Sequence, residues 1–161
     1  MVELKFVKLR DGAKIPSKTS GNAGYDIYAL FGEDYWYVEP HQTVMIPTGL
    51  ASIIPEEYYF QYFERGSTGT KGIGQRCGVI DASYRGEWFI PITNHNSRRM
   101  VIIKKGVIYK DDTVLQYPYE KALTQAVLLP VPETNITEIS IEEFSNYGTI
   151  RGTGMLGSSG K

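Results

Sequence analysis

Residues 78–86, which read GVIDASYRG, combine a carboxylate and a phenol ring within four positions. If the two residues between them form a tight turn, Asp81 and Tyr84 become a cross-strand pair, and such pairs project their side chains to one face about 5 Å apart. The carboxylate can then accept a proton, and the ring can pack against a sugar-like ligand. Gly78 would leave its backbone N–H and C=O open to the edge of a base. The same spacing also fits an ordinary surface hairpin, so the rest of the chain must decide.

Two glycine-rich loops, each with an arginine, are candidates for binding a polyphosphate. Residues 65–74 read RGSTGTKGIG and begin with Arg65, and residues 147–161 read YGTIRGTGMLGSSGK and include Arg151. Successive backbone N–H groups and a two-pronged guanidinium both suit phosphate oxygens. The first loop lacks the Gly-Lys-Ser/Thr ending of a P-loop, and the second also fits a frayed terminus. Both loops therefore stay open between a binding and a structural role.

Charge and cysteine content narrow the class of protein. The formal net charge is −1 without a run of Lys or Arg, which argues against nucleic-acid and membrane-surface partners. The single cysteine, Cys77, cannot form an internal disulfide, and charges interrupt the first twelve residues where a signal peptide needs an apolar run. No apolar run approaches the roughly 20 residues that span a bilayer. We therefore expect a soluble, cytoplasmic protein.

The elements that must position these residues are short strands. Runs rich in β-branched and aromatic residues, separated by Gly and Pro turns, predict strands at residues 36–38, 43–46, 50–54, 58–64, 87–93, 101–104 and 124–129. This pattern indicates an all-β fold, a distorted jelly roll or β-clip barrel. A short helix is expected at residues 139–144. We predict one domain over residues 1–146, followed by a flexible glycine-rich arm over residues 147–161.

The order of the motifs resembles that of the trimeric, all-β dUTP pyrophosphatase (dUTPase) family, and the resemblance spans nearly the whole chain. Five segments carry it: AGYDIYAL at residues 23–30, RGSTGTKGI at 65–73, GVIDASYRG at 78–86, LTQAVLLPV at 123–131 and RGTGMLGSSG at 151–160. The first and third are close matches. The resemblance implies hydrolysis of dUTP to dUMP and pyrophosphate by attack of water on the α-phosphate.

The resemblance also implies roles for individual residues. Asp81 is then the general base, and Tyr84 packs under the deoxyribose and excludes a 2′-hydroxyl. The backbone around Gly78 and Ile80 reads uracil, and Gln75 lies near the position where the family often offers an amide to the base. The triphosphate is expected to contact a set of basic, hydroxyl, amide and glycine residues: Arg65, Gly66, Ser67, Thr68, Gln125, Arg151, Gly157, Ser158 and Ser159.

The family uses Mg²⁺ that bridges the three phosphates largely through water, in keeping with the reluctance of this ion to lose its hydration shell. Asp26 matches the aspartate of the first motif and is expected either to act through water on the metal or to hold the motif together. The implied assembly is a homotrimer with shared active sites, in which the tail of one chain reaches its neighbour. Leu156 stands where the family carries an aromatic cap over uracil, which predicts weaker closure.

A second departure is extra chain before the fourth motif, roughly residues 107–121, which suggests an added hairpin or arm. It raises an alternative function, a nucleotide-dependent interaction module whose insert binds a protein partner. A dCTP deaminase shares the fold, but that family places a glutamate five residues beyond the glycine that ends the third motif. Here this position is Pro91, which cannot do acid–base chemistry.

Overall fold

The computed structural model describes residues 1–149 and 152–153, and the chain forms two compact units. The first unit is Met1–Val131, and the second begins at Pro132. The first unit is thus shorter than the domain expected over residues 1–146. The reason is that the last strand of this unit ends at Pro130, and no strand follows it in the part of the chain that the structure describes.

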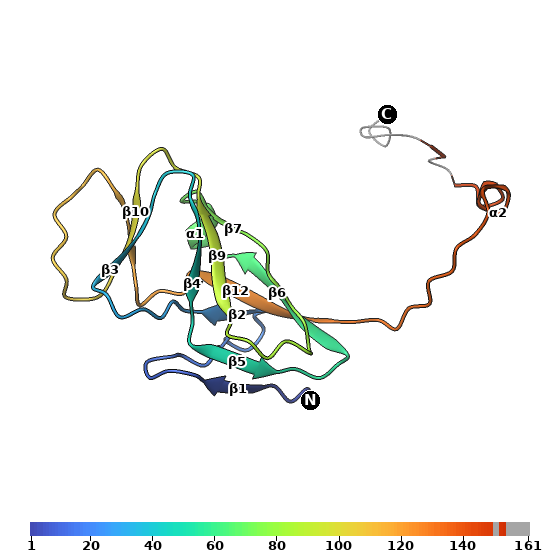
Figure 1. Cartoon of the computed structure of the whole chain (residues 1–161), viewed down its shortest axis with the longest axis horizontal. Coiled ribbons are helices and arrows are strands. Elements are labelled where there is room, and N and C mark those ends of the chain that lie inside the picture. The colour runs from blue at the N-terminus through green and yellow to red at the C-terminus, as the bar shows by residue number, and fades with distance from the viewer. Residues whose placement is uncertain (150–151, 154–161) are drawn as a thin grey trace. The chain divides into compact units, whose positions relative to one another are not determined.

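The described residues contain twelve short strands, which form four small sheets (Figure 1). In the first sheet, β1 (Lys5–Lys8) pairs with β5 (Leu50–Ile53). The second sheet has the order β4 (Thr43–Pro47), β9 (Phe89–Asn94), β7 (Ile73–Gln75). The third has the order β11 (Leu115–Pro118), β10 (Met100–Ile103), β3 (Tyr35–Val38). The fourth has the order β2 (Gly24–Ile27), β12 (Thr124–Pro130), β6 (Tyr58–Glu64), β8 (Val79–Ile80). The predicted all-β jelly-roll class is confirmed.

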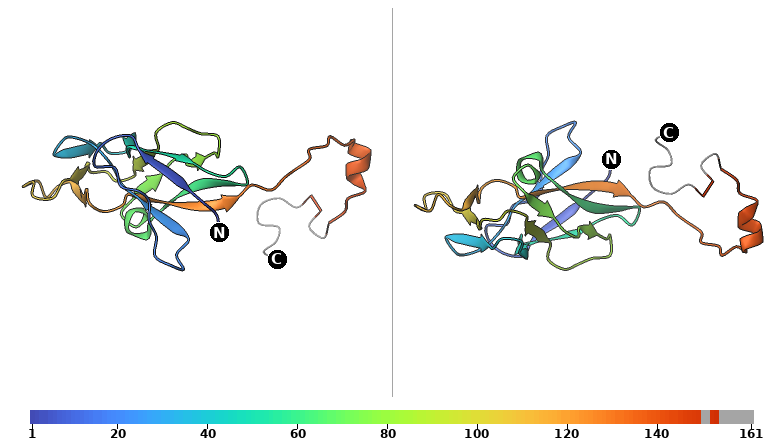
Figure 2. Two further views of the ribbon diagram at one scale, coloured as in Figure 1. Left: turned by 90° about the horizontal axis from the view of Figure 1, so that it is seen from below. Right: turned by 90° about the horizontal axis from the view of Figure 1, so that it is seen from above.

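The fourth sheet carries most of the candidate site. Its two longest strands, β12 and β6, pair antiparallel over seven residues, from Thr124 opposite Glu64 to Pro130 opposite Tyr58. In the views of Figures 1 and 2 the orange β12 runs beside the green β6. Because β2 pairs with the start of β12 and β8 pairs with β6, the first, third and fourth motifs contribute strands to one sheet, and the second motif begins directly after β6.

A core of aliphatic and aromatic side chains lies between the sheets and fixes their positions. The core includes three fully buried side chains: Phe60 of β6, Trp88 directly before β9, and Ile90 of β9. The rings of Phe60 and Trp88 meet edge to face with centroids 5.2 Å apart. Trp88 also donates through its indole N–H to Ser52 Oγ at 3.1 Å, which satisfies its polar atom. Trp88 lies two residues after the third motif, so this core contact anchors the motif to β5 and β6.

The insert differs from the expected hairpin. β10 and β11 run parallel, with Met100 opposite Leu115 and Ile103 opposite Pro118, so the chain between them is a crossover loop at residues 104–114. Parallel strands cannot be joined by a tight turn, which explains why the insert is long. The loop returns over β3, where Tyr109 donates a hydrogen bond to the hydroxyl of Tyr37 at 3.2 Å.

The described residues of the second unit contain one short helix, α2 (Ile141–Ser145), close to the helix predicted at residues 139–144. Ser140 caps it, because its hydroxyl accepts a hydrogen bond from the N–H of Glu143 at 3.1 Å. None of the helices in the described ranges is long and apolar enough to cross a membrane.

Candidate active site

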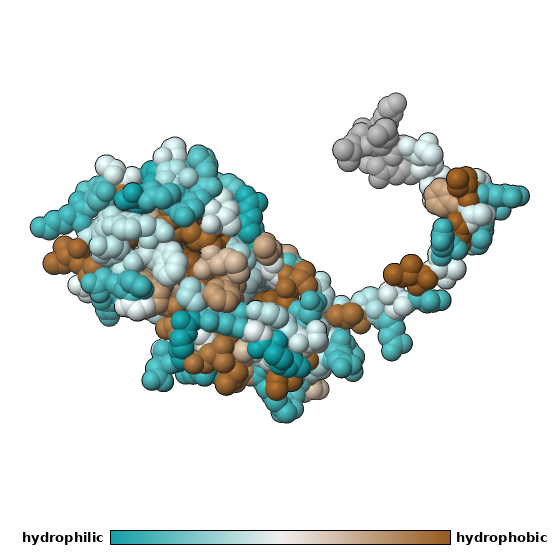
Figure 3. Space-filling model, viewed as in Figure 1, coloured by the Kyte–Doolittle hydropathy of each residue, from teal (hydrophilic) through white to brown (hydrophobic). Residues whose placement is uncertain are grey.

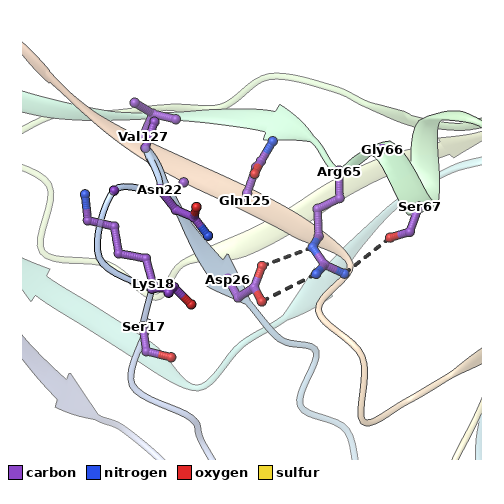
Figure 4. A pocket seen from close by; sticks show the side chains of 13 residues that line it. Ser17, Lys18, Asn22, Asp26, Arg65, Gly66, Ser67, Gln125 and Val127 are labelled. Atoms are coloured by element: carbon purple, nitrogen blue, oxygen red, sulfur yellow. Dashed lines mark hydrogen bonds and ion pairs between the residues drawn. The ribbon is translucent and has the colours of Figure 1, made fainter.

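A cavity of about 800 Å³ brings the first, second and fourth motifs together (Figure 4). Five residues expected to bind phosphate or metal line it: Asp26, Arg65, Gly66, Ser67 and Gln125. Sequence reasoning missed the loop that precedes β2, which contributes Ser17, Lys18 and Asn22. A lysine within the polar stretch SKTSGN, directly before the first motif, was the signal that could have identified this wall.

The pairing of β2 with β12 sets one side of this cavity. Asp26 lies opposite Gln125, and Gly24 lies opposite Val127, so these four residues share one face of the sheet. A Cβ atom at Gly24 would lie 2.5 Å from Oε1 of Gln125. The glycine of the first motif therefore makes room for the glutamine of the fourth.

Arg65 is held in place by several contacts. Its Nε lies 3.0 Å from Oδ1 of Asp26, and its Nη2 donates to Oδ2 at 3.4 Å. Nη1 donates to the carbonyl of Ala122 at 2.9 Å and to Oγ of Ser67 at 3.3 Å. Figure 4 shows the guanidinium between Asp26 and Ser67. These contacts fix the orientation of the Arg65 guanidinium beside the cavity. They also give Asp26 a direct structural partner.

The second motif forms a single helical turn, α1 (Gly66–Gly69), in which the hydroxyl groups of Ser67 and Thr68, both expected to contact phosphate, have different surroundings. Thr68 is buried, and its Oγ1 accepts from the N–H of Arg65 at 3.1 Å and donates to the carbonyl of Arg65 at 3.0 Å. Ser67 is exposed and lines the cavity. The expected contact of Thr68 with a ligand is therefore not supported, because its hydroxyl closes the turn instead.

A second, smaller cavity of about 180 Å³ lies at the third motif and is lined by Gly78, Ile80, Asp81 and Tyr84. The expected turn is present, since the N–H of Tyr84 donates to the carbonyl of Asp81 at 3.1 Å. The expected hairpin is not, because β8 pairs with β6 and the chain after the turn enters β9 of another sheet. Asp81 and Tyr84 are thus joined by a turn and are not a cross-strand pair.

Gly78 has a backbone conformation that few other residues adopt, with φ of 129°. A Cβ atom there would lie 2.8 Å from Cβ of Tyr62. Its carbonyl accepts a hydrogen bond from the N–H of Tyr62 at 2.9 Å, so this group is not fully open as expected. The carbonyl has a second lone pair, and the glycine keeps the backbone close to the cavity.

The ring of Tyr84 is fixed by its own hydroxyl, which donates to the carbonyl of Glu87 at 2.9 Å. The carboxylate of Glu87 in turn forms an ion pair with Arg10 and accepts the N–H of Gly49 at 2.8 Å. By contrast, Asp81 is exposed, and no contact from another described side chain engages its carboxylate. The fixed ring of Tyr84 is suited to packing against a ligand, and the unengaged carboxylate of Asp81 is suited to accepting a proton.

The two cavities do not share a lining residue. A shallow depression of about 480 Å³ shares lining residues with both cavities: Gln125 with the first, and Tyr62 and Cys77 with the second. The single chain therefore holds the carboxylate of Asp81 and the guanidinium of Arg65 in separate cavities.

Comparison with known proteins identifies the family. The family model for dUTPase matches residues 10–108. A deoxyuridine 5′-triphosphate nucleotidohydrolase from Nautilia profundicola is 34% identical over 164 residues, covering 99% of this chain and 100% of its own. The chain belongs to the dUTPase family.

Solved dUTPase structures share the fold. The dUTPase of Staphylococcus bacteriophage 80alpha, solved with dUPNHPP, aligns with a TM-score of 0.78 and 23% identity, over 99% of both chains. A mutant dUTPase from phage phi11 of S. aureus, described with a structural Mg(II) ion, aligns with a TM-score of 0.67 and 25% identity, over 85% of this chain and 96% of its own.

Gln75 does not reach the Asp81 cavity as the dUTPase resemblance suggested. Its amide N–H₂ group donates to the carbonyls of Arg76 and Pro91, both at 2.8 Å, and its side chain lines the shallow depression. The shorter spacing before the third motif places it one strand away, at the end of β7. The predicted tail residues Arg151, Leu156, Gly157, Ser158 and Ser159 lie outside the described residues.

Gly86→Ala is expected to displace the ring of Tyr84. A Cβ atom at Gly86 would lie 2.6 Å from Cζ of Tyr84, so the ring must leave its hydrogen bond to Glu87. If the ring screens the sugar, the preference for dUTP over UTP should fall about tenfold while the fold stays intact. Hydrolysis rates on both nucleotides and the thermal midpoint measure this. Gly32→Ala, where an added Cβ meets open space, is the control; equal preferences in both variants would contradict the screening role.

Proposed function

We propose that this dUTPase-family chain hydrolyses dUTP to dUMP and pyrophosphate, with Asp81 activating the attacking water. The observation that carries the proposal is the turn at residues 81–84, which presents an unengaged carboxylate beside an anchored tyrosine ring at one cavity. Family membership gives the substrate class, since the relatives that the chain matches over their full length are named for dUTP hydrolysis.

The chemistry assigned to Asp81 is general-base catalysis. The ionised carboxylate accepts hydrogen bonds only, so it orients a water molecule and takes its proton. The water oxygen forms a bond to the α-phosphorus, while the bond from the α-phosphorus to the oxygen that bridges to the β-phosphate breaks. Pyrophosphate leaves with that electron pair, and dUMP remains. The exposure of Asp81 leaves room for the water.

The nucleoside is assigned to the cavity of the third motif. Tyr84 offers a ring held at both ends of the side chain, which packs under the deoxyribose and leaves no space for a 2′-hydroxyl. The backbone around Gly78 and Ile80 is close enough to the cavity to pair with the polar edge of uracil. A buried polar edge rejects a base that leaves it unpaired.

The phosphates are assigned to the cavity of Arg65, Gly66, Ser67 and Gln125, with Arg151, Ser158 and Ser159 of the tail as further partners. The contacts with Asp26 and Ala122 hold the guanidinium before any ligand arrives, which lowers the cost of ordering it. Lys18 lines the same cavity and adds a second positive charge.

The oxygen donors of this cavity fit a magnesium ion that is held mainly by the ligand. Asp26, Asn22 and Gln125 supply one carboxylate and two amides, and no group of three metal-binding side chains occurs among the described residues. Magnesium retains waters and is often bound through one carboxylate plus substrate phosphates. Bound there, Mg²⁺ would neutralise phosphate charge. Because both oxygens of Asp26 already contact Arg65, its contact with the ion is assigned through water.

The separation of the two cavities supports an assembly in which chains complete each other's sites, and we propose a homotrimer. Exposed apolar side chains such as Met45, Ile53 and Val79, exposed by 61%, 53% and 60%, are available for contacts between copies. The homotrimer and the substrate are tested together by measuring the molecular mass in solution with and without dUMP.

A pyrophosphate-release assay with dUTP, dTTP, dCTP and UTP tests the proposed activity. We expect hydrolysis of dUTP to exceed that of the other three by at least about a hundredfold, and to fall when Mg²⁺ is removed by a chelator. Equal rates on dUTP and UTP would refute the proposed selectivity. Deamination of dCTP is not supported, because Pro91 lines the Asp81 cavity and carries no ionisable group.

A second candidate function is protein binding through the insert. The loop at residues 104–114 carries Ile108, which is 83% exposed, next to a cluster of three tyrosine rings formed by Tyr35, Tyr37 and Tyr109. Arg99 lies over the ring of Tyr37, 4.8 Å from its centroid. Tyrosine and arginine are enriched in the hot spots of protein interfaces. In the view of Figure 3, apolar and hydrophilic residues are otherwise interspersed over the first unit.

Removing the exposed apolar groups of the insert separates the two functions. Ile108→Ser should leave dUTP hydrolysis within about twofold of wild type, because the loop contributes no lining to either cavity of the active site. If the insert is a binding surface, the same variant should lose the partner that wild type retains in a pull-down. Loss of hydrolysis in Ile108→Ser would instead show that the insert supports catalysis.

A further inference from the structure

The hydroxyl group of Tyr62 is an unusual polar atom in this fold. Tyr62 is only 4% exposed, and its Oη has no hydrogen-bond partner. Among the described residues, the one other buried side-chain atom in this state is Oε1 of Gln75, and both side chains line the same shallow depression. Because buried polar groups are nearly always paired, an unpaired one in a well-formed core requires a specific explanation.

The rest of the core pairs its polar atoms. Tyr117 is 1% exposed, and its hydroxyl donates to the carbonyl of Ala122 at 2.7 Å. Thr124 is fully buried, and its hydroxyl donates to the carbonyl of Phe63 at 2.7 Å. The unpaired state of Tyr62 is therefore a local property and not a general looseness of the packing.

Tyr62 is built into the wall of the Asp81 cavity. It lies on β6, its N–H donates to the carbonyl of Gly78, and its ring packs edge-on against Trp88 with centroids 5.9 Å apart. Tyr62 lines the cavity together with Asp81 and Tyr84. Burial, and then the neighbouring Tyr84, raises the pKa of Tyr62 well above its usual value. The hydroxyl thus stays protonated and can donate at any working pH.

We propose that Tyr62 is a specificity-determining residue whose hydroxyl hydrogen-bonds to the polar edge of the nucleobase. The inference rests on the proposed function, which places a deoxyuridine nucleotide in this cavity. A neutral hydroxyl suits a neutral carbonyl or ring nitrogen, whereas the phosphates are assigned to the cavity of Arg65. The backbone of Gly78, which contacts Tyr62 directly, is the group already assigned to the base.

The proposal predicts opposite effects on binding and on stability. Tyr62→Phe removes an unpaired polar atom from the free protein, so its thermal midpoint should stay the same or rise. The same variant loses a hydrogen bond in the complex, so the affinity for dUMP should fall about tenfold. Tyr117→Phe is the matched control, because it makes the same chemical change at a paired hydroxyl. It should lower the midpoint and leave dUMP affinity unchanged.

The experiment is calorimetric titration of the full-length protein with three probes, dUMP, 2-deoxyribose 5-phosphate and pyrophosphate, plus thermal denaturation and dUTP hydrolysis. We expect Tyr62→Phe to weaken dUMP alone. Unchanged dUMP affinity, or a midpoint that falls as in Tyr117→Phe, would overturn the proposal, since the hydroxyl would then be satisfied elsewhere. Equal weakening of dUMP and deoxyribose phosphate would overturn the assignment to the base. A wild type that neither binds dUMP nor hydrolyses dUTP refutes the proposed function itself and this inference with it.

Discussion

Asp81→Asn should bind dUMP nearly as well as wild type and lose most turnover of dUTP. Asparagine has almost the same shape and preserves the turn, which depends on the backbone contact between residues 81 and 84. It cannot accept a proton from water near neutral pH, so we expect kcat to fall by about 10³-fold, within the usual range for a general base. Pyrophosphate release gives kcat, and titration with dUMP gives the affinity.

Asp112→Asn is the matched control for this experiment, because Asp112 is also exposed but lies in the insert loop. It should retain full activity. Near-normal turnover in Asp81→Asn would mean that Asp81 only closes the turn, and the general base would have to be sought elsewhere. A loss of dUMP binding together with turnover would assign Asp81 to ligand binding.

Arg65→Lys should reduce kcat/KM for dUTP by about a hundredfold, although the charge is kept. A lysine cannot grip two phosphate oxygens, and it cannot reproduce the four contacts with Asp26, Ala122 and Ser67. The loss of oriented, charge-assisted hydrogen bonds accounts for an effect of this size. Steady-state kinetics with dUTP and calorimetric titration with pyrophosphate measure it.

The same substitution tests how far Arg65 is structural. Its ion pair with Asp26 is partly exposed, with 27% and 35% of the two side chains accessible, so the free energy of unfolding should change by less than about 1 kcal/mol. Arg98→Lys, at an exposed loop position, is the control and should change neither quantity. Normal kinetics with a large loss of stability would reverse the assignment of Arg65 from phosphate binding to folding.

The longer strands were predictable because their sequences are dense in β-branched and aromatic residues. The predicted segment at residues 58–64 is β6, and the segment at 124–129 is β12 without its last residue. The prediction missed β1, β2, β7, β8 and β11, which have two to four residues each. Strands this short carry little periodic signal, and their partners in distant parts of the chain determine them.

The site was predictable where chemistry and motif coincide, and less so where tertiary packing decides. Asp26, Arg65 and Gln125 meet in one cavity as expected, since each is a polar residue within one of the recognised motifs. Nothing in the sequence indicated a role for Tyr62, because the chain has twelve tyrosines and a tyrosine within a strand is common. Its unpaired hydroxyl becomes visible only when the packing around it is known.

The close fit between Tyr84 and Gly86 constrains how this enzyme family member can change over generations. A side chain at position 86 displaces the ring at position 84 unless that ring has become smaller, since the two would occupy the same space. The effects of mutations at these positions are therefore strongly non-additive. A lineage that loses Tyr84 also frees position 86 to vary, and each later change there makes a return to tyrosine harder.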